Sequence, residues 1–383
     1  MDRVRIGIIG VGGMGSFHAG YLLAGEVQRA ELVAVCDVNP ARLELFNELK
    51  TFIDSRELIR SGLVDAVLIA TPHYSHTTIG IDALEQGLHV LVEKPISVHK
   101  ADCERLIAAH TNKAQVFAAM FQMRTAPHFQ KIKELVASGE LGEIQRTSWI
   151  ITSWFRTEAY YASGGWRATW KGEGGGVLTN QCPHNLDLFQ WIAGLPARVR
   201  AFCSLGKYHN IEVEDEVTAY LEYPNGATGV FVTSTGEAPG TNRLEIAGDR
   251  GKLVFENGKL SLERNEVPAS EFLRTCPEMF AKPGAERVDV EVTGHSGKHQ
   301  EITQNFVDAI LDGVPLLAPA EEGIHSVELA NAMLYSSQTG QTVEMPLDGR
   351  AYEEFLKGLI ASSRFEKKVS DAGPTSDMGK SFL

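Results

Sequence analysis

The first 120 residues alternate between short apolar runs and longer amphipathic segments. Uninterrupted Val, Ile, Leu and Ala residues indicate strands buried on both faces, and the segments between them, such as 15–26 and 76–87, have helical patterns. Strands that alternate with helices predict a doubly wound α/β sheet with parallel strands, the Rossmann plan. The predicted strands are 4–10, 31–37, 65–71, 89–94 and 115–120.

After Arg124 the pattern changes to one helix, 127–142, followed by longer strands in which apolar and polar residues alternate. Asn225-Gly226, between two such strands, is a strong hairpin signal. The pattern predicts a C-terminal α+β domain with a large, mainly antiparallel open sheet. Its predicted strands are 144–154, 197–205, 216–223, 227–235 and 242–256, and helical patterns return at 299–313 and 321–341.

The composition narrows the classes of partner. A formal net charge of −13 without a basic run argues against nucleic acid, and no run approaches the roughly 18 apolar residues of a membrane span. The five cysteines are far apart, and no His, Cys and carboxylate spacing indicates a metal site. We therefore expect a cytoplasmic protein that binds neither metal nor membrane. The cysteines are Cys36, Cys103, Cys182, Cys203 and Cys276.

A glycine-rich turn follows the first predicted strand and opens a helix. Gly10, Gly12 and Gly15 have the Gly-x-Gly-x-x-Gly spacing that lets a backbone approach the pyrophosphate of a dinucleotide. Asp37 ends the second strand, where a carboxylate accepts hydrogen bonds from an adenosine ribose and repels a 2′-phosphate. The alternative for Asp37 is a turn residue. NAD is therefore favoured over NADP, although Arg42 keeps NADP open.

These features predict three segments. Residues 1–123 are expected to form an NAD(P)-binding Rossmann domain, and residues 124–368 an α+β domain for substrate binding and oligomerisation. The segment 369–383 is rich in Gly, Pro, Ser and polar residues, so we expect a flexible tail.

Glu93, Lys94 and Pro95 stand at the end of the fourth strand, on the sheet edge where open α/β sheets bind ligands. A lysine there can donate to a substrate oxygen, or act as a base if burial lowers its pKa. The alternative is an ordinary solvated lysine in a loop.

The stretch GGGVLTNQCPHNLDLFQW, 174–191, places Asn180, His184 and Asp187 at helical spacing, so that the three could share one face. Pro183 requires the helix to begin near 179–183, and Gly194 is a stop signal. The alternatives are an N-cap for Asn180, a satisfied core histidine for His184 and a structural hydrogen-bond partner for Asp187. The three glycines indicate either close backbone approach or a flexible loop.

The segment 153–176 combines aromatic residues with arginines. Ring faces cover the C–H patches of a sugar while donors bind its hydroxyls, so the composition favours a carbohydrate site over an ordinary packed loop. Arg156 and Arg167 suit an anionic group on the substrate. The residues concerned are Trp154, Arg156, Tyr160, Tyr161, Trp166, Arg167 and Trp170.

Several motifs together resemble the Gfo/Idh/MocA family of oxidoreductases, named after glucose-fructose oxidoreductase and inositol dehydrogenase. They are GIIGVGGMG, ATPHYSH, EKP, FQMRTAPHF, GELGEIQ and GEGGGVLTNQCPHNLDLFQWIAG, and they span nearly the whole chain. The resemblance implies that Lys94 is catalytic and precedes a cis proline. It also implies that His184 exchanges a proton with the substrate hydroxyl while hydride moves to nicotinamide C4. Many relatives carry Asp where this chain has Asn180, which cannot hold a negative charge.

The resemblance completes the set of expected site residues. His73 replaces the usual Asn of the ATPHYSH loop, and its role stays open. The expected catalytic residues are Lys94, His184 and Asn180. The expected cofactor-binding residues are Gly10, Gly12, Gly13, Met14, Gly15, Asp37, Thr71, Pro72, His76, Glu93, Lys94 and Gln122. The expected substrate contacts are Arg124, Arg156, Tyr160, Trp166, Arg167, Asn180 and His184.

The expected function is NAD-dependent hydride transfer to or from a secondary alcohol or ketone of a sugar, glycoside or cyclic polyol. One alternative is an oxidoreductive glycoside hydrolase that oxidises its sugar transiently and returns the hydride. The other is a non-catalytic sugar or NADH sensor, against which the presence of Lys94 and His184 argues. Relatives associate through the sheet of the second domain, which implies a homodimer or homotetramer.

Overall fold

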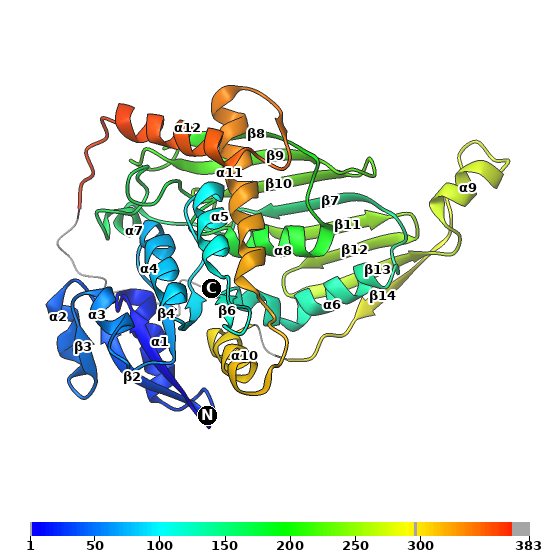
Figure 1. Cartoon of the computed structure of the whole chain (residues 1–383). Helices are drawn as coiled ribbons and strands as arrows, with labels where there is room; N and C mark the ends of the chain where they lie inside the picture. Colours follow the sequence, from blue (N-terminus) through cyan, green and yellow to red (C-terminus); the bar gives the residue numbers. More distant parts are fainter. Residues whose placement is uncertain (1, 295–296, 370–383) are drawn as a thin grey trace.

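The computed structural model describes residues 2–294 and 297–369 and contains two sheets, each with its own hydrophobic core (Figure 1). The expected tail lies outside the described residues, apart from residue 369. Both predicted fold classes are confirmed.

The first sheet has six parallel strands in the order β3-β2-β1-β4-β5-β6. The predicted strands correspond to all of these except β3, which is a short and largely exposed edge strand without an apolar run. The strands are β1 (Val4–Ile9), β2 (Ala30–Cys36), β3 (Lys50–Phe52), β4 (Ala66–Ile69), β5 (His89–Val92) and β6 (Phe117–Ala119).

Helices on both sides of this sheet begin at local signals. The Asn39 side chain accepts a hydrogen bond from the Ala41 amide at 3.1 Å, and Asp54 caps the following helix through the Arg56 amide at 2.8 Å. These helices are α1 (Gly13–Leu23), α2 (Pro40–Leu43), η1 (Glu44–Phe46), α3 (Ser55–Ile59), α4 (His73–Glu85) and α5 (Lys100–Ala109).

The second sheet has nine strands in the order β14-β13-β12-β11-β7-β10-β9-β8-β15, and among these described strands only β7 and β10 pair in parallel. The Asn225-Gly226 turn joins β9 to β10 as predicted, whereas the predicted strand 242–256 is a hairpin of two strands. The strands are β7 (Ile144–Ile151), β8 (Arg198–Leu205), β9 (Glu214–Glu222), β10 (Thr228–Ser234), β11 (Asn242–Gly248), β12 (Gly251–Glu256), β13 (Lys259–Asn265), β14 (Ala285–Val290) and β15 (Val343–Glu344).

One face of this sheet is covered by helices, with α8 and α11 packed across it (Figure 1). The fully buried Trp149 of β7 packs against Phe129 beneath them. The remaining helices are η2 (Gln122–Thr125), α6 (Pro127–Ala137), α7 (Glu158–Ala162), α8 (Pro183–Ala193), α9 (Ala269–Thr275), α10 (His299–Asp312), η3 (Ala320–Gly323), α11 (Ile324–Thr339) and α12 (Gly349–Ser362).

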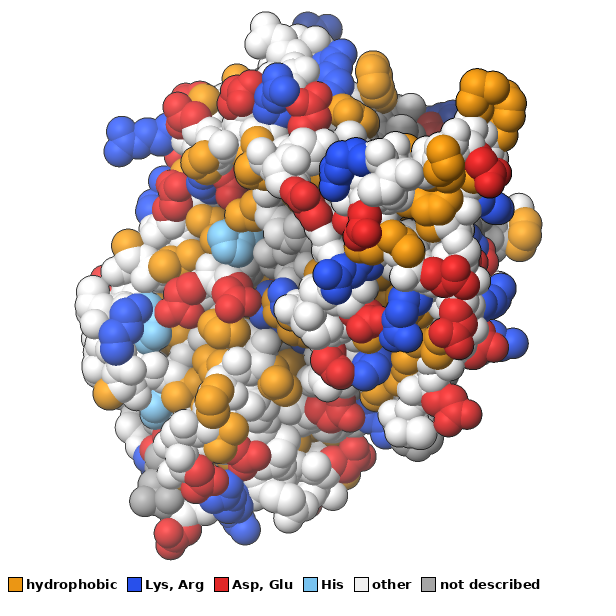
Figure 2. All heavy atoms as spheres, turned by 90° about the vertical axis from the view of Figure 1, so that its right-hand side faces the viewer, with side chains coloured by type: hydrophobic (Ala, Val, Ile, Leu, Met, Phe, Trp, Pro, Cys, Tyr) orange, Lys and Arg blue, Asp and Glu red, His pale blue; other side chains and the backbone are white. Residues whose placement is uncertain are grey.

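The opposite face of the second sheet is open. Phe202 of β8, Tyr220 of β9 and Ile150 of β7 lie on this same face, and the Phe202 side chain is 64% exposed. Elsewhere acidic and basic side chains are interspersed, as on the side shown in Figure 2. Among the described residues, no helix is long and apolar enough to cross a membrane, and no cluster of potential metal ligands occurs. All five cysteines are described, and each is a free thiol.

The domain boundary differs from the prediction. Ile302, Phe306 and Val307 of α10 belong to the core of the first sheet, and the Ala119 amide donates to the carbonyl of Ala318 at 3.0 Å. The chain therefore returns to the first domain after residue 299, because the apolar face of α10 packs against α1, β1 and β5. A single division at residue 124 is thus corrected.

Candidate active site

The glycine-rich turn is shaped for close backbone approach. Gly10 has φ +90°, and a Cβ at Gly15 would lie 1.8 Å from the carbonyl oxygen of Gly10. At Gly12 the nearest atom to an added Cβ is a terminal nitrogen of Arg42, 3.6 Å away. Helix α1 begins at Gly13, with no side-chain cap and no acidic residue in its first turn. A helix N-terminus of this kind attracts a phosphate, so the turn, Met14 included, fits the pyrophosphate of a dinucleotide.

Asp37 organises the turn beside this loop. Its buried carboxylate accepts hydrogen bonds from the amides of Val11 at 3.0 Å and Asn39 at 2.8 Å, and it pairs with Arg42 at 3.2 Å. These contacts fit the alternative in which Asp37 is a turn residue. The carboxylate still stands at the carboxyl end of β2, where a ribose would bind.

Thr71 and Pro72 lie in the loop after β4, and His76 lies in the first turn of α4. Thr71 Oγ1 is buried and has no protein partner among the described residues, which suits a cofactor contact. His76 is fully buried, and its two ring nitrogens lie 2.9 Å from the carbonyl oxygen of Pro95 and 2.8 Å from that of Thr71. Burial lowers its pKa. His76 therefore ties two loops together, and its expected place in the cofactor lining stays a prediction.

Glu93 also faces the protein. One carboxylate oxygen lies 2.6 Å from His18 Nε2, and the other accepts from the Lys94 amide at 3.1 Å. His18 in turn contacts the hydroxyl of Tyr21, which contacts Thr303. Burial opposes ionisation of Glu93, but the His18 hydrogen bond and nearby positive charges outweigh it and hold the pKa at about 2. Glu93 thus orders the start of the Lys94 segment.

Lys94 reaches across to the second domain. Its Nζ donates to the backbone carbonyl of Asn180 at 3.0 Å, and the Lys94–Pro95 peptide is cis, as the resemblance implied. Burial lowers the Lys94 pKa, and the Glu93 and Glu173 carboxylates act in the opposite direction. A lysine in such surroundings can bind a reacting oxygen.

Helix α8 spans Pro183–Ala193 and ends at Gly194, as predicted. Asn180, however, precedes the helix, so it shares no helical face with His184 and Asp187, and the N-cap is Cys182. The Asn180 carbonyl oxygen Oδ1 accepts from the Tyr160 hydroxyl and from Gln181, both at 3.0 Å. Because Pro183 occupies the first helical position, the helix begins after Asn180, and the predicted face shared with His184 and Asp187 does not form.

His184 is buried at the start of α8. Its Nε2 lies 3.3 Å from the amide nitrogen of Gln122, and its Nδ1 has no partner among the described residues. Burial and the charge of Lys94 hold its pKa well below the usual value, so the ring is neutral and can accept a proton. Gln122 and His184 thus bring two polar atoms that lack a partner among the described residues, Oε1 and Nδ1, to the contact between η2 and α8, which fits a bound nicotinamide or substrate.

Arg124 does not face a substrate. Its side chain is 1% exposed, and all three of its nitrogens are engaged by the Asp187 and Glu322 carboxylates and the Leu317 carbonyl. The expected substrate contact is corrected to a structural ion pair that joins η2 to α8. Asp187 is the structural partner anticipated for it.

The segment after β7 supplies a wall of aromatic and cationic side chains. The guanidinium carbons of Arg167 and Arg156 lie 4.4 and 5.2 Å from the Tyr160 ring centroid, and Arg167 donates to the Tyr160 hydroxyl at 2.6 Å. Trp166 contacts Arg167 and the ring of His73. The structure thus gathers four of the expected substrate residues beside Asn180. Tyr161 and Trp170 are buried within the second-domain core.

Sequence reasoning missed Glu173, His18 and Lys367. Lys367 donates to the carbonyl of Arg167 at 2.7 Å. The two residues are far apart in the sequence, so this contact has no local sequence signal. Glu173 had one available signal, an acidic residue inside a run of glycines. The glycines of this run lie close to their neighbours. A Cβ added at Gly174 would lie 2.1 Å from Val98, and one added at Gly176 would lie 2.0 Å from the Glu214 carbonyl oxygen.

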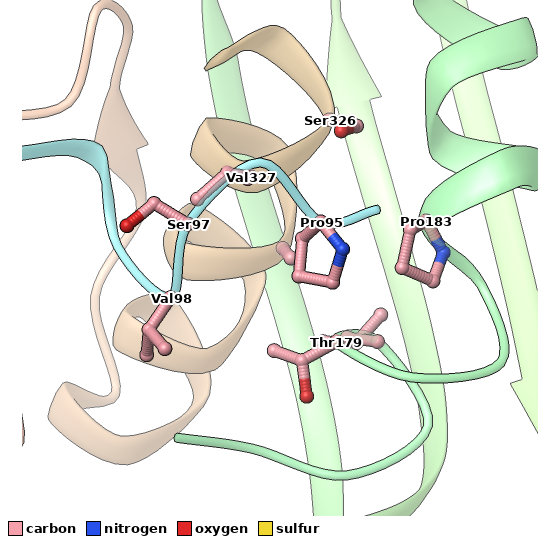
Figure 3. A pocket seen from close by; sticks show the side chains of 9 residues that line it. Pro95, Ser97, Val98, Thr179, Pro183, Ser326 and Val327 are labelled. Atoms are coloured by element: carbon pink, nitrogen blue, oxygen red, sulfur yellow. The ribbon is translucent and has the colours of Figure 1, made fainter. Parts of the chain in front are cut away.

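Behind Lys94 lies a small cavity, shown in Figure 3, between Pro95, Thr179, Pro183 and Ser326. Its volume is about 10 Å³, which is room for roughly one water molecule. It is too small for a substrate.

Comparisons with known proteins agree with this architecture. Residues 4–138 match the model of the oxidoreductase family with an NAD-binding Rossmann fold, and residues 129–254 match the GFO/IDH/MocA C-terminal domain. The chain is 33% identical to inositol 2-dehydrogenase 1 of Saccharopolyspora erythraea over 90% of this chain and 97% of that one. It is 30% identical to myo-inositol 2-dehydrogenase of Thermotoga maritima, over 66% and 75%.

A solved structure is also similar. The WlbA dehydrogenase from Bordetella pertussis, in complex with NADH and UDP-GlcNAcA, superimposes with a TM-score of 0.75 and 25% identity over 90% of this chain and 100% of that one. With the Rossmann turn, the Glu-Lys-Pro segment and the open mixed sheet in place, the chain belongs to the GFO/IDH/MocA family of oxidoreductases and binds a nicotinamide cofactor.

Proposed function

We propose that the protein is an NAD-dependent dehydrogenase that acts on a secondary alcohol of a sugar, glycoside or cyclic polyol. The observation that carries this proposal is that Lys94 of the first domain bonds to Asn180 of the second, with its charge acting on the buried His184. The inositol dehydrogenases among its relatives, and the neighbour that binds NADH and UDP-GlcNAcA, support this class of substrate.

The reaction divides between Lys94 and His184. The Lys94 ammonium group binds the reacting oxygen and stabilises the negative charge that develops on it. Neutral His184 takes the hydroxyl proton, which its low pKa lets it release again to solvent or return to a ketone. The nicotinamide, when bound, accepts or donates the hydride at C4. Gln122 holds His184 in place through its amide.

The wall of Arg156, Tyr160, Trp166 and Arg167 binds the remainder of the substrate. Ring faces cover the C–H patches of a sugar, and the two guanidinium groups suit an anionic substituent. On the cofactor side, Asp37 favours NAD because its carboxylate repels a 2′-phosphate. Arg42 pairs with Asp37 and reduces this discrimination without abolishing it.

The open face of the second sheet supports a homodimer or homotetramer. Phe202, Tyr220 and Ile150 expose apolar area on the same face of the sheet, and a second copy would bury it. Sedimentation of the purified protein against a Phe202→Asp variant tests this association. A wild-type monomer would contradict it.

The first experiment follows nicotinamide absorbance with NAD or NADP against inositols, free sugars, sugar acids and glycosides, with product sugars analysed in parallel. Steady NADH formation with one class supports the proposal. Glycoside cleavage without net NADH would instead indicate the oxidoreductive hydrolase. Absence of turnover with retained NADH binding would favour the sensor.

The Lys94→Ala variant tests the assignment of residues. It should abolish hydride transfer while NAD binding, measured by fluorescence quenching, stays within about twofold of the wild type, because the pyrophosphate site is untouched. Lys113→Ala, on the exposed surface, is the matched control. Undiminished turnover of Lys94→Ala would contradict the proposed mechanism.

A further inference from the structure

Glu173 is a buried carboxylate in the loop before α8. Its side chain is 1% exposed, and its two oxygens accept hydrogen bonds from the Ala168 amide at 2.5 Å and from Asn180 Nδ2. The Glu173 amide donates to the Thr169 carbonyl at 2.9 Å, so the loop closes on itself. Gly174 follows with φ +80° and packs directly on Val98. The backbone therefore holds this carboxylate in one place.

Closing the loop does not require a charge at this position. A neutral Gln could also accept from the Ala168 amide, and burial of a carboxylate is unfavourable unless it is paired. The charged groups around Glu173 are Arg167 and Lys367, with Lys94 on the reacting side and the buried Glu214 behind. His73 bonds to the backbone carbonyl of Glu173. Three cations therefore face one carboxylate between the two domains.

Glu173 reaches Lys94 through Asn180. Only the amide nitrogen of Asn180 can donate to a carboxylate, so Oδ1 must face the Tyr160 hydroxyl and Gln181. The backbone carbonyl of the same Asn180 accepts from Lys94 Nζ. Asn180 thus links Glu173, through its side chain, to Lys94, through its backbone.

We propose that Glu173 is a positioning residue that supplies, seven residues upstream, the negative charge that Asn180 cannot carry. It orients Asn180 toward the substrate wall and stabilises the ammonium form of Lys94 at the reacting oxygen. The catalytic part of this inference rests on the proposed function, whereas the coupling of Glu173 to Lys94 does not.

The test moves the carboxylate to the other side of its hydrogen bond. E173Q keeps the shape but removes the charge, so kcat should fall about 10- to 100-fold, as for other losses of alignment at a reacting centre. The affinity for NAD should change less than twofold. N180D places two carboxylates face to face and should also lower kcat. In the double variant E173Q/N180D the amide and the carboxylate have exchanged places, so the hydrogen bond re-forms with its donor and acceptor reversed. Its kcat should recover to within about fivefold of the wild type.

Glu158→Gln is the matched control, because this exposed carboxylate lies in the same segment and accepts a hydrogen bond from the Asn210 amide at 2.9 Å. It should leave kcat and KM unchanged. A double variant no more active than the poorer single variant, or an E173Q enzyme with wild-type kcat, overturns the proposal.

A second readout needs no substrate. The pH dependence of Lys94 acetylation, followed by mass spectrometry of its peptide, reports the Lys94 pKa directly. Loss of a nearby negative charge favours the neutral amine, so E173Q should lower this pKa by roughly one pH unit, and the double variant should restore it. An unchanged pKa in folded E173Q overturns the coupling. If E173Q does not fold, the double variant decides, since it keeps the hydrogen bond. If the wild type oxidises no sugar, the proposed function fails while this measurement still tests the coupling.

Discussion

Two buried carboxylates flank Lys94, and their pKa values move in opposite directions. On the first-domain side the pKa of Glu93 falls to about 2, and on the second-domain side the pKa of Glu173 rises. Burial opposes ionisation at both. Glu93 has the His18 ring at 2.6 Å in a packed interior, whereas Glu173 is bonded by a neutral amide side chain and one backbone amide.

The difference shows that the type of partner, rather than the depth of burial, decides the ionisation of a carboxylate in this protein. The Glu93 side is a permanent charge held between β5 and α1. The Glu173 side belongs to a loop, where burial raises the carboxyl pKa while Arg167, Lys367 and the Asn180 hydrogen bond act in the opposite direction.

The largest expected effect comes from Glu93→Gln, which replaces the ionised carboxylate that contacts His18 Nε2 with a neutral amide. Losing a buried hydrogen bond to a charged group costs about 3 kcal/mol, so urea unfolding at pH 7 should show a loss of about this size. A lowered pKa stabilises the fold above the unfolded value near 4.5, and this contribution is lost as the pH falls toward about 2. The difference between variant and wild type should therefore shrink below pH 4.5. A constant difference would contradict the lowered pKa of Glu93.

Glu214→Gln should have the opposite sign. Glu214 accepts from the Gly176 and Leu178 amides, and burial raises its pKa to about 7. A raised carboxyl pKa lowers stability as the pH rises from 4.5 through 7, because the folded state retains its proton. The variant should therefore be more stable than the wild type at pH 8, by no more than about 3 kcal/mol, and equal to it at pH 4.5. Thermal melting across this range measures the difference. Equal stability of the variant and the wild type at pH 8 would show that burial of the Glu214 carboxylate is compensated by its hydrogen bonds, as it is for Glu93.

Gly174→Ala tests whether the loop places Glu173. The φ of +80° and the contact with Val98 should make this variant less stable by about 1 to 3 kcal/mol and lower kcat together with stability. Gly165→Ala, in the same segment but with its nearest neighbour at 3.8 Å, is the control. Equal effects of the two variants would show that the loop tolerates movement.

The smallest effect is expected from Tyr160→Phe. The hydroxyl accepts from Arg167 and Gln181 and donates to Asn180, and because these partly buried partners regain water, we expect a net loss of about 1 kcal/mol, or roughly fivefold. We expect this change mainly in KM, because Glu173 still holds Asn180. A fall in kcat as large as that of E173Q would show that Tyr160, rather than Glu173, orients the amide.

Much of the site was predictable because its signals are local. The glycine turn, Lys94 at the end of its strand and the start of α8 at Pro183 follow from spacing and backbone preference within a few residues. The contacts of His76 and Arg124 were not predictable, because a sequence does not show which distant groups a buried side chain meets. Their partners, the Pro95 carbonyl and the Asp187 carboxylate, lie 19 and 63 residues away.

By itself the sequence determined the two fold classes, the cofactor turn and the residues available for proton and hydride chemistry. Periodicity, glycine geometry and proline position act over one or two turns of chain. Only the tertiary structure decided that His18 pairs with Glu93, that α10 returns to the first domain and that Glu173 bonds to Asn180. These contacts depend on how side chains from distant or irregular segments pack in three dimensions, and packing is set by the whole core rather than by any local pattern.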